Sequence, residues 1–351
     1  MKKNLLTLGL AAVLSVSLLA GCSSSAEETT AAETEAATEA ATEEAAEEES
    51  TEAASEEAAD AETTAFDGKL GVIVLEADHG WTAGVSYYAE QKCDEMGIDY
   101  QIYTSNNVND QANQIEQAIS DGCTAIVLEP HTDEVSIAAQ AIPDAGIPLV
   151  LFDRTVTGDY DAYVAGDNPG IGTAGAKEIG ELLGGQGTVI VHNVPSSGVV
   201  STDRVDAFKA EMEAGYPDIK LIDITTDDFT QESGLKAMTD ALVANPEIDA
   251  VFSIDDESSL GFLRAINDAG RTDIQLMTGC GGAQAYFNAI AEQEGAPELI
   301  TATYSPMMIQ DAIDVAIEIA NGGTVEKEVI VPPTIVSKDN VDEFLDSSSP
   351  Y

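Results

Sequence analysis

Short runs of Val, Ile and Leu that alternate with amphipathic stretches constrain the fold of this chain more than any other feature. The runs occupy residues 70–75, 124–128, 148–152, 188–192, 250–254 and 274–278. Nearly continuous branched apolar residues are typical of strands buried on both faces of a sheet. The stretches between them repeat apolar residues at helical spacing, as Ile309, Ile313 and Ala316 do. Strands that alternate with helices predict parallel sheets with right-handed crossovers.

The length of the alternating part indicates more than one sheet. Residues 66–351 comprise 286 of the 351 residues, which is enough for two domains of ordinary size. About ten strands over this length are more than one compact parallel sheet normally holds. The sequence therefore predicts an α/β protein with two doubly wound parallel-sheet lobes.

The first 65 residues have the features of an export signal and a tether. Residues 1–21 combine Lys2 and Lys3 with an apolar stretch too short to span a bilayer, as a secretory signal peptide does. The sequence Leu19-Ala20-Gly21-Cys22 resembles the lipobox of bacterial lipoproteins, which implies that Cys22 carries a lipid. An ordinary secreted protein with a chance cysteine is the alternative. Residues 26–64 consist almost only of Ala, Glu, Thr and Ser, so we expect residues 22–65 to form a lipidated, disordered acidic tether.

The charge of the chain excludes several classes of partner. The formal net charge is −50, and residues 66–351 alone carry −37. Nucleic-acid binding needs clustered Lys and Arg, so a nucleic-acid partner is excluded. Electrostatic docking on anionic lipid is disfavoured for the same reason. After the signal peptide no apolar run approaches the ~20 residues of a membrane span.

The cysteines favour neither a zinc site nor a disulfide framework. Besides Cys22 the chain has Cys93, Cys123 and Cys280, which are widely spaced. Cys123 precedes an apolar run, where a buried thiol behaves as a small apolar residue. A bridge between Cys93 and Cys123 remains open at this point.

Polar and aromatic residues gather where the apolar runs end. Ligands of open parallel sheets bind beyond the carboxyl ends of the strands, so these residues form the candidate site. They include the only tryptophan and one of the four arginines. Such a set suits a small polar ligand with an apolar face, for which a sugar is a good example. The segments are 78–81, 129–131, 153–155, 167–168, 192–193, 255–257 and 279–281.

Several of these segments together resemble a known family. Phe152-Asp153-Arg154, Gly166-Asp167-Asn168, residues 204–208, residues 227–230 and residues 255–257 are similar, in order and spacing, to motifs of type I periplasmic binding proteins. The resemblance is to the ribose- and galactofuranose-binding lipoproteins of ABC transporters, and it covers residues 69–340. Each motif is weak alone, whereas the ordered set is specific.

The resemblance implies a role for each matching residue. Trp81 would stack on the sugar ring, because ring C–H groups lie well against an aromatic face. His79 would hydrogen-bond a hydroxyl. Asp153 and Arg154 would together fix the orientation of the ring, since a carboxylate accepts and a guanidinium donates from a rigid fork.

The second lobe would supply the opposite wall of the site. The resemblance implies that Arg204 reaches the ligand, that Phe229 forms an aromatic wall and that Asp255 contributes a carboxylate. Asp256 and Glu257 are expected instead to cap the following helix.

Two positions depart from the pattern of the family. Gly279-Cys280 stands where relatives commonly have Phe-Asp, and Tyr304 stands where they often have a hinge Gln. Cys280 and Tyr304 are still expected to line the site. The departure predicts a roomier pocket, unless Tyr304 fills it, and a ligand larger or less hydroxylated there than ribose.

Sugar transport has three alternatives: a metal site, an enzyme and a signalling module. The three histidines His79, His131 and His192 all follow apolar runs, but they lack the short spacing of metal ligands, so no metal and no cofactor is expected. An enzyme is disfavoured, because the chain has neither a phosphate-binding glycine loop nor a Gly-x-Ser-x-Gly elbow. Asp255-Asp256 leaves a glycosidase as a distant alternative. A module that presents a sugar or a sugar-derived autoinducer to a membrane signalling receptor is the main alternative.

The resemblance also implies the lobes of the chain, its anchor and its partners. Three crossovers, which form a three-strand hinge, would place residues 66–167 with 305–331 in one lobe and residues 168–304 with 332–351 in the other. The protein would be an extracytoplasmic monomer that is anchored to the cell membrane through Cys22. It would capture a monosaccharide and present it to an ABC permease and its ATPase.

Overall fold

The computed structural model describes residues 66–351. The expected signal peptide at 1–21, the lipidated Cys22 and the acidic tether to residue 65 lie outside the described residues. Within the described part, no helix is both long and apolar enough to span a bilayer.

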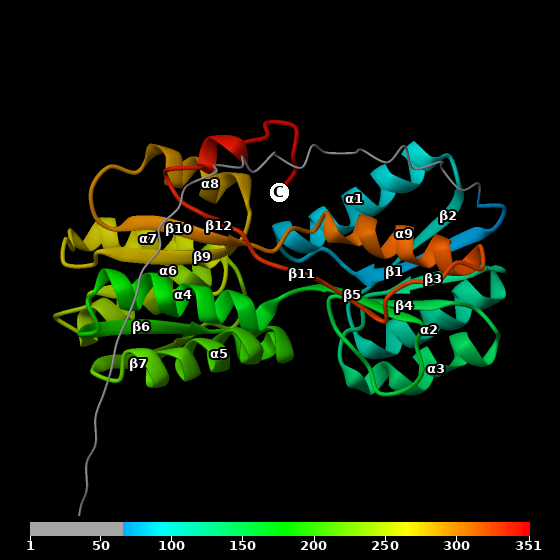
Figure 1. Ribbon diagram of the computed structural model, residues 1–351, viewed down its shortest axis with the longest axis horizontal. Coiled ribbons are helices and arrows are strands. Elements are labelled where there is room, and N and C mark those ends of the chain that lie inside the picture. The colour runs from blue at the N-terminus through cyan, green and yellow to red at the C-terminus, as the bar shows by residue number, and fades with distance from the viewer. Residues whose placement is uncertain (1–65) are drawn as a thin grey trace, which may run out of the picture. The chain divides into compact units, whose positions relative to one another are not determined.

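The first sheet is parallel and is covered by helices on both faces (Figure 1). Its strands, in spatial order, are β11 (Glu328–Val331), β5 (Ala162–Gly166), β4 (Leu149–Phe152), β3 (Ala125–Leu128), β1 (Lys69–Leu75) and β2 (Asp99–Ser105). One face is covered by α1 (Gly80–Met96) and α9 (Met308–Ala320), and the other by α2 (Val108–Ser120) and α3 (Ser136–Asp144). A short 3₁₀ helix, Asp133–Val135, precedes α3. We call this sheet with its helices the first lobe.

Alternate residues of β1 explain why both faces are covered. Val72 and Val74 pack in the core under α1 and α9, whereas Ile73 packs in the core under α2 and α3. Successive side chains of a strand point to opposite faces, so a run of consecutive apolar residues requires a core on each side.

The second sheet has the same construction. Its strands, in spatial order, are β12 (Ile335–Val336), β10 (Glu298–Thr303), β9 (Leu276–Gly281), β8 (Ala250–Phe252), β6 (Gly187–Asn193) and β7 (Ile219–Thr225). One face carries α4 (Asn168–Leu182) and α5 (Val199–Gly215), and the other carries α6 (Gln231–Ala244), α7 (Asp256–Ala269) and α8 (Gln284–Glu292). Two 3₁₀ helices, Pro195–Ser197 and Val341–Glu343, complete this second lobe.

The chain passes between the sheets after β5, after β10 and after β11. The predicted fold class is confirmed, with one exception to parallel pairing, because β12 runs antiparallel to β10. The two-residue β12 follows a crossing and only closes the edge of its sheet. The open question about the cysteines is also resolved: Cys93, Cys123 and Cys280 are buried and free.

Candidate functional site

A cavity of about 50 Å³ lies where the ends of several strands and the start of α1 meet. Its walls come from both lobes. All nine residues that the sequence singled out line it: His79, Trp81, Asp153, Arg154, Arg204, Phe229, Asp255, Cys280 and Tyr304. The structure therefore brings the predicted site residues together in one place.

Trp81 is fixed by contacts with two other aromatic side chains. Its Nε1 donates a hydrogen bond of 2.8 Å to the backbone oxygen of Tyr304. Its ring lies parallel to Phe152, with centroids 6.1 Å apart, and tilted against Tyr304 at 5.8 Å. An indole whose N–H already has a partner offers its remaining surface for apolar contact, which suits the C–H groups of a sugar.

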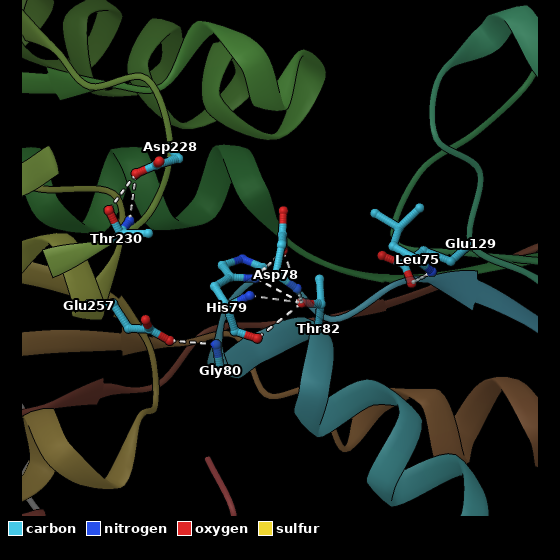
Figure 2. A network of polar contacts seen from close by, with 9 residues as sticks. All are labelled: Leu75, Asp78, His79, Gly80, Thr82, Glu129, Asp228, Thr230 and Glu257. Carbon is cyan, nitrogen blue, oxygen red and sulfur yellow. Dashed lines mark hydrogen bonds and ion pairs between the residues drawn. The ribbon is translucent and has the colours of Figure 1, made fainter. Parts of the chain in front are cut away.

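His79 is placed by contacts at the start of α1, which Figure 2 shows, and by Phe229 of the other lobe. Its Nδ1 lies 2.9 Å from both Thr82 Oγ1 and Asp78 Oδ1, and its ring stacks on Phe229 at 5.5 Å. Burial opposes the charged ring, but the bond to Asp78 and the nearby carboxylates of Asp255 and Glu257 outweigh it, so the pKa of His79 is raised. His79 is thus a donor held against an aromatic wall.

Asp153 and Arg154 follow β4 directly. Asp153 adopts a φ of 63°, the only positive φ of a non-glycine residue among residues 66–351, and this turn directs its carboxylate into the cavity wall. Its Oδ1 accepts a 2.6 Å hydrogen bond from Tyr304 Oη. Arg154 Nε lies 3.2 Å from Asp153 Oδ2, and Arg154 Nη1 donates to the His131 backbone oxygen at 3.0 Å. Arg154 Nε is buried and has no hydrogen-bond partner among the described residues, although it forms the ion pair with Asp153.

Arg204 forms the deep end of the site from the second lobe. Its Nε donates to Asn168 Oδ1 and its Nη1 to the Ile254 oxygen, both at 2.8 Å. The guanidinium lies over the ring of Tyr304, 4.5 Å from the centroid. Two of its five N–H groups are used in these two hydrogen bonds.

The acidic segment after β8 differs from expectation. Asp255 is the residue that caps α7, since its Oδ2 accepts a 2.6 Å bond from Ser258 N. The expectation that Asp256 and Glu257 cap this helix is wrong. Asp256 Oδ2 instead accepts hydrogen bonds from the backbone N–H groups of Gly282 and Ala283. Glu257 Oε1 accepts a 2.7 Å hydrogen bond from Gly80 N of the other lobe (Figure 2).

Burial controls the protonation of Asp255 and Cys280. It raises the pKa of Asp255 to about 7 and that of the Cys280 thiol to about 12. Cys280 is therefore a neutral thiol at the pH of most environments, and Asp255 titrates near neutrality while retaining one oxygen for its cap.

The roomier pocket expected beside Gly279-Cys280 is contradicted by the packing. A Cβ on Gly279 would lie 2.2 Å from Asp256 Oδ1 and 2.7 Å from the Tyr286 ring. The space of a larger side chain is thus filled by neighbours, and the inner cavity is small. Gly281 of the candidate segment 279–281 lines it too, together with three residues that the sequence did not indicate: Thr82, Val200 and Tyr351.

A second cavity of about 520 Å³ adjoins the first. His79, Thr82, Arg154 and Phe229 belong to the walls of both. Small-molecule pockets usually measure about 300–1,000 Å³. The inner cavity holds the nine expected site residues, and the outer cavity, which shares four residues with it, adds most of the volume.

The other two histidines do not join His79. His192 lies inside β6, bonded to Thr226 Oγ1 and Ser253 Oγ, and burial lowers its pKa to about 3. His131 is bonded to the Ser105 backbone oxygen, in the wall of the outer cavity. Among residues 66–351 no cluster of three His, Cys, Asp or Glu side chains has the arrangement of a metal site.

The chain is similar to known binding proteins in sequence and in structure. The chain is 30% identical over 297 residues to a putative rhizopine-binding protein of Rhizobium meliloti, which covers 81% of this chain and 91% of that protein. It is also 30% identical to a ribose import binding protein of Bacillus subtilis, over 75% of this chain and 85% of the other. A solved ABC transporter solute-binding protein of Mycobacterium smegmatis with bound glycerol is 26% identical and superposes with a TM-score of 0.73, over 80% of this chain and 98% of that one.

The family itself is shown by a direct match. The profile of the periplasmic binding protein domain matches residues 70–324, which is most of the chain and includes the strands of both sheets except β11 and β12. The family inferred from the ordered motifs is therefore confirmed, and the chain belongs to the periplasmic binding proteins.

Proposed function

We propose that this protein binds a monosaccharide in the cavity between its lobes and delivers it to an ABC permease and its ATPase. The observation that carries the proposal is the convergence of Trp81, Asp153, Arg154 and Phe229 from two lobes on one cavity. The relatives named as binding ribose or rhizopine support the ligand class, and they are binding proteins rather than enzymes.

The groups in the cavity suit a polyhydroxyl ligand. Carboxylates accept hydrogen bonds from hydroxyl groups, while Arg154, Arg204 and His79 donate to them. The indole of Trp81 offers the apolar contact. A sugar presents both hydroxyl groups and C–H faces, so it can use every type of group in the wall.

Movement of the lobes would admit and enclose the ligand. We propose that residues 66–167 with 305–331 and residues 168–304 with 332–351 move as two bodies about the three crossings. Hinge closure around a ligand is a common motion of two-lobed proteins. The contacts that join the lobes at the cavity, such as Gly80 N with Glu257 Oε1, would form when the lobes close.

The lipobox-like sequence supports a membrane anchor. We propose that Cys22 carries the lipid and that residues 23–65 tether the lobes outside the cytoplasm, beside the permease. A single acyl chain binds membranes only marginally, so more than one chain is needed for stable anchoring.

Calorimetry on the full chain, purified in detergent, tests the ligand class. Ribose, arabinose, galactose, glucose and myo-inositol form the first panel. We expect at least one to bind, and a ligand at 100 times its dissociation constant to raise the free energy of unfolding by about 2.7 kcal/mol. Binding by none of a broad sugar panel would contradict the proposed function.

Single substitutions then test the site. Trp81→Ala and Arg154→Ala should each weaken the preferred sugar by about 2 kcal/mol, or roughly 30-fold, because both groups lie at the desolvated centre. Tyr87→Ala and Arg264→Ala are matched controls, since Tyr87 is exposed on the same helix as Trp81 and Arg264 is exposed on α7. Wild-type affinity in the two site variants would show that the sugar binds elsewhere.

A further inference from the structure

The segment that follows the last 3₁₀ helix runs from one lobe to the other. Phe344 packs against Phe287 of α8, and Gln284 of α8 bonds the backbone of Phe344 and Asp346 at 3.0 and 2.8 Å. Residue 346 is therefore fixed to the second lobe. Ser349 Oγ lies 2.8 Å from Tyr88 Oη, on α1 of the first lobe. Figure 1 draws this segment in red, passing from α8 toward the start of α1.

Tyr351 at the end of this segment enters the wall of the inner cavity. Its side chain is only 8% exposed, and it lines the same cavity as Trp81 and Arg204. A Cβ placed on Gly281 would lie 2.2 Å from Tyr351 Oη, and one on Gly80 would lie 3.1 Å from its ring. Gly281 and Gly80 belong to different lobes, so the phenol lies between the two.

The hydroxyl of Tyr351 is available to a ligand. Its Oη lies beside Gly281 in the cavity wall, and the bonds between Ser349 and Tyr351 use only the backbone of Tyr351. It lies at the end of β9, where Gly279, Cys280 and Gly281 carry no large side chain into the cavity. Burial, together with Asp256 and Asp255, raises the pKa of Tyr351 well above its usual value, so the hydroxyl keeps its proton for donation.

We propose that Tyr351 is a specificity-determining residue that contacts the sugar, which rests on the proposed function. Its ring limits the size of ligand that the inner cavity accepts, and its hydroxyl bonds one sugar hydroxyl beside Cys280. The bond between Ser349 and Tyr88 positions the ring, because it attaches the segment to the first lobe. The aromatic surface at the end of β9 is thus supplied by a distant part of the chain.

Four variants of the full chain test this role by calorimetry. Tyr351→Phe removes only the hydroxyl, Tyr351→Ala also removes the ring, and Tyr88→Phe removes the positioning bond. Tyr87→Phe is the matched control for Tyr88→Phe, since Tyr87 is the exposed neighbour on the same helix. The sugar that binds the unchanged chain best is identified first, so a failure at that step concerns the proposed function and not Tyr351.

The expected results differ between the variants. Tyr351→Phe should weaken the best sugar about tenfold, and a deoxy analogue that lacks the bonded hydroxyl should bind both chains equally. Tyr351→Ala should lose more affinity for that sugar while binding larger sugars, such as disaccharides, better than the unchanged chain does. Tyr88→Phe should weaken binding about threefold, and Tyr87→Phe should not change it.

Two results would overturn the proposal. Unchanged affinity and preference in both Tyr351→Phe and Tyr351→Ala would show that the side chain does not touch the ligand. Tighter binding of every sugar by Tyr351→Ala would show that the segment competes with the ligand. Should Tyr351→Ala fail to fold, Tyr351→Phe and the deoxy analogue still decide the question.

Discussion

Replacing Glu129 by glutamine should change how the stability of this protein depends on pH. Glu129 follows β3 and is fully buried. Its Oε2 accepts a 3.2 Å bond from Leu75 N, and its Oε1 has no hydrogen-bond partner within the described residues (Figure 2). Burial, and then the nearby charge of Asp153, raises the pKa of Glu129 from 4.5 to about 7, although Arg154 acts in the opposite direction.

The size of the effect follows from that shift. Below pH 4.5 Glu129 is protonated in both the folded and the unfolded chain, so it has no effect on their balance. As the pH rises toward 7 only the unfolded chain releases the proton, and the free energy of unfolding falls by about 1.4 kcal/mol for each pH unit. The loss amounts to about 3 kcal/mol at pH 8 and about 2 kcal/mol between pH 5 and pH 8. Glutamine does not titrate, so the variant lacks this loss.

Urea unfolding, followed by the fluorescence of the only tryptophan, measures the difference. The free energies of the unchanged chain and of Glu129→Gln are compared at pH 5 and pH 8, without sugar. Any cost of burying the amide is the same at both pH values, so it cancels when the two free-energy differences are subtracted. Glu134→Gln is the control, because Glu134 is exposed. A difference between variant and unchanged chain that stays the same at both pH values would refute the reasoning.

Two further predictions concern the anchor and the deep end of the site. Cys22→Ser should move the protein from the membrane fraction to the soluble fraction of fractionated cells, and unchanged membrane association would contradict lipidation of Cys22. Arg204→Lys should lower the free energy of unfolding by about 2 kcal/mol in urea, because an ammonium group cannot keep both the planar contact with Tyr304 and the two bonds of the guanidinium. Unchanged stability would show that these contacts contribute little.

Six of the eight inner strands of the described sheets match the apolar runs of the sequence, whereas the inner strands β5 and β10 and the edge strands do not. The run at 70–75 is apolar without interruption because β1 is buried on both faces. The edge strands β2 and β7 alternate exposed and half-buried residues, so they lack such a run. A strand at the edge of a sheet has fewer neighbours, and its sequence carries a weaker signal. The antiparallel β12 has two residues, which is too short for an apolar run or an alternating pattern in the sequence.

The candidate site was predictable where it follows the ends of strands. Trp81, Arg154 and Asp255 come shortly after apolar runs, and parallel strands bring such positions to one edge. The sequence did not predict Tyr351 as a site residue, because Tyr351 reaches the cavity only through the path of its segment across both lobes. The assignment of the cap of α7 to Asp256 and Glu257 was wrong because sequence alone does not show which of three adjacent acids begins the helix.

The charges around the cavity indicate why a neutral ligand suits it. Asp153, Asp255 and the buried Glu129 lie near Arg154, Arg204 and His79, and residues 66–351 are strongly acidic as a whole. A ligand that brought its own carboxylate or phosphate would add repulsion where burial already raises the pKa of Asp255 and Glu129. Sugar hydroxyl groups can instead donate to these carboxylates and accept from Arg154 without adding charge. We therefore expect the protein to bind uncharged sugars more tightly than sugar acids and sugar phosphates, because the carboxyl groups of the site already disfavour further negative charge.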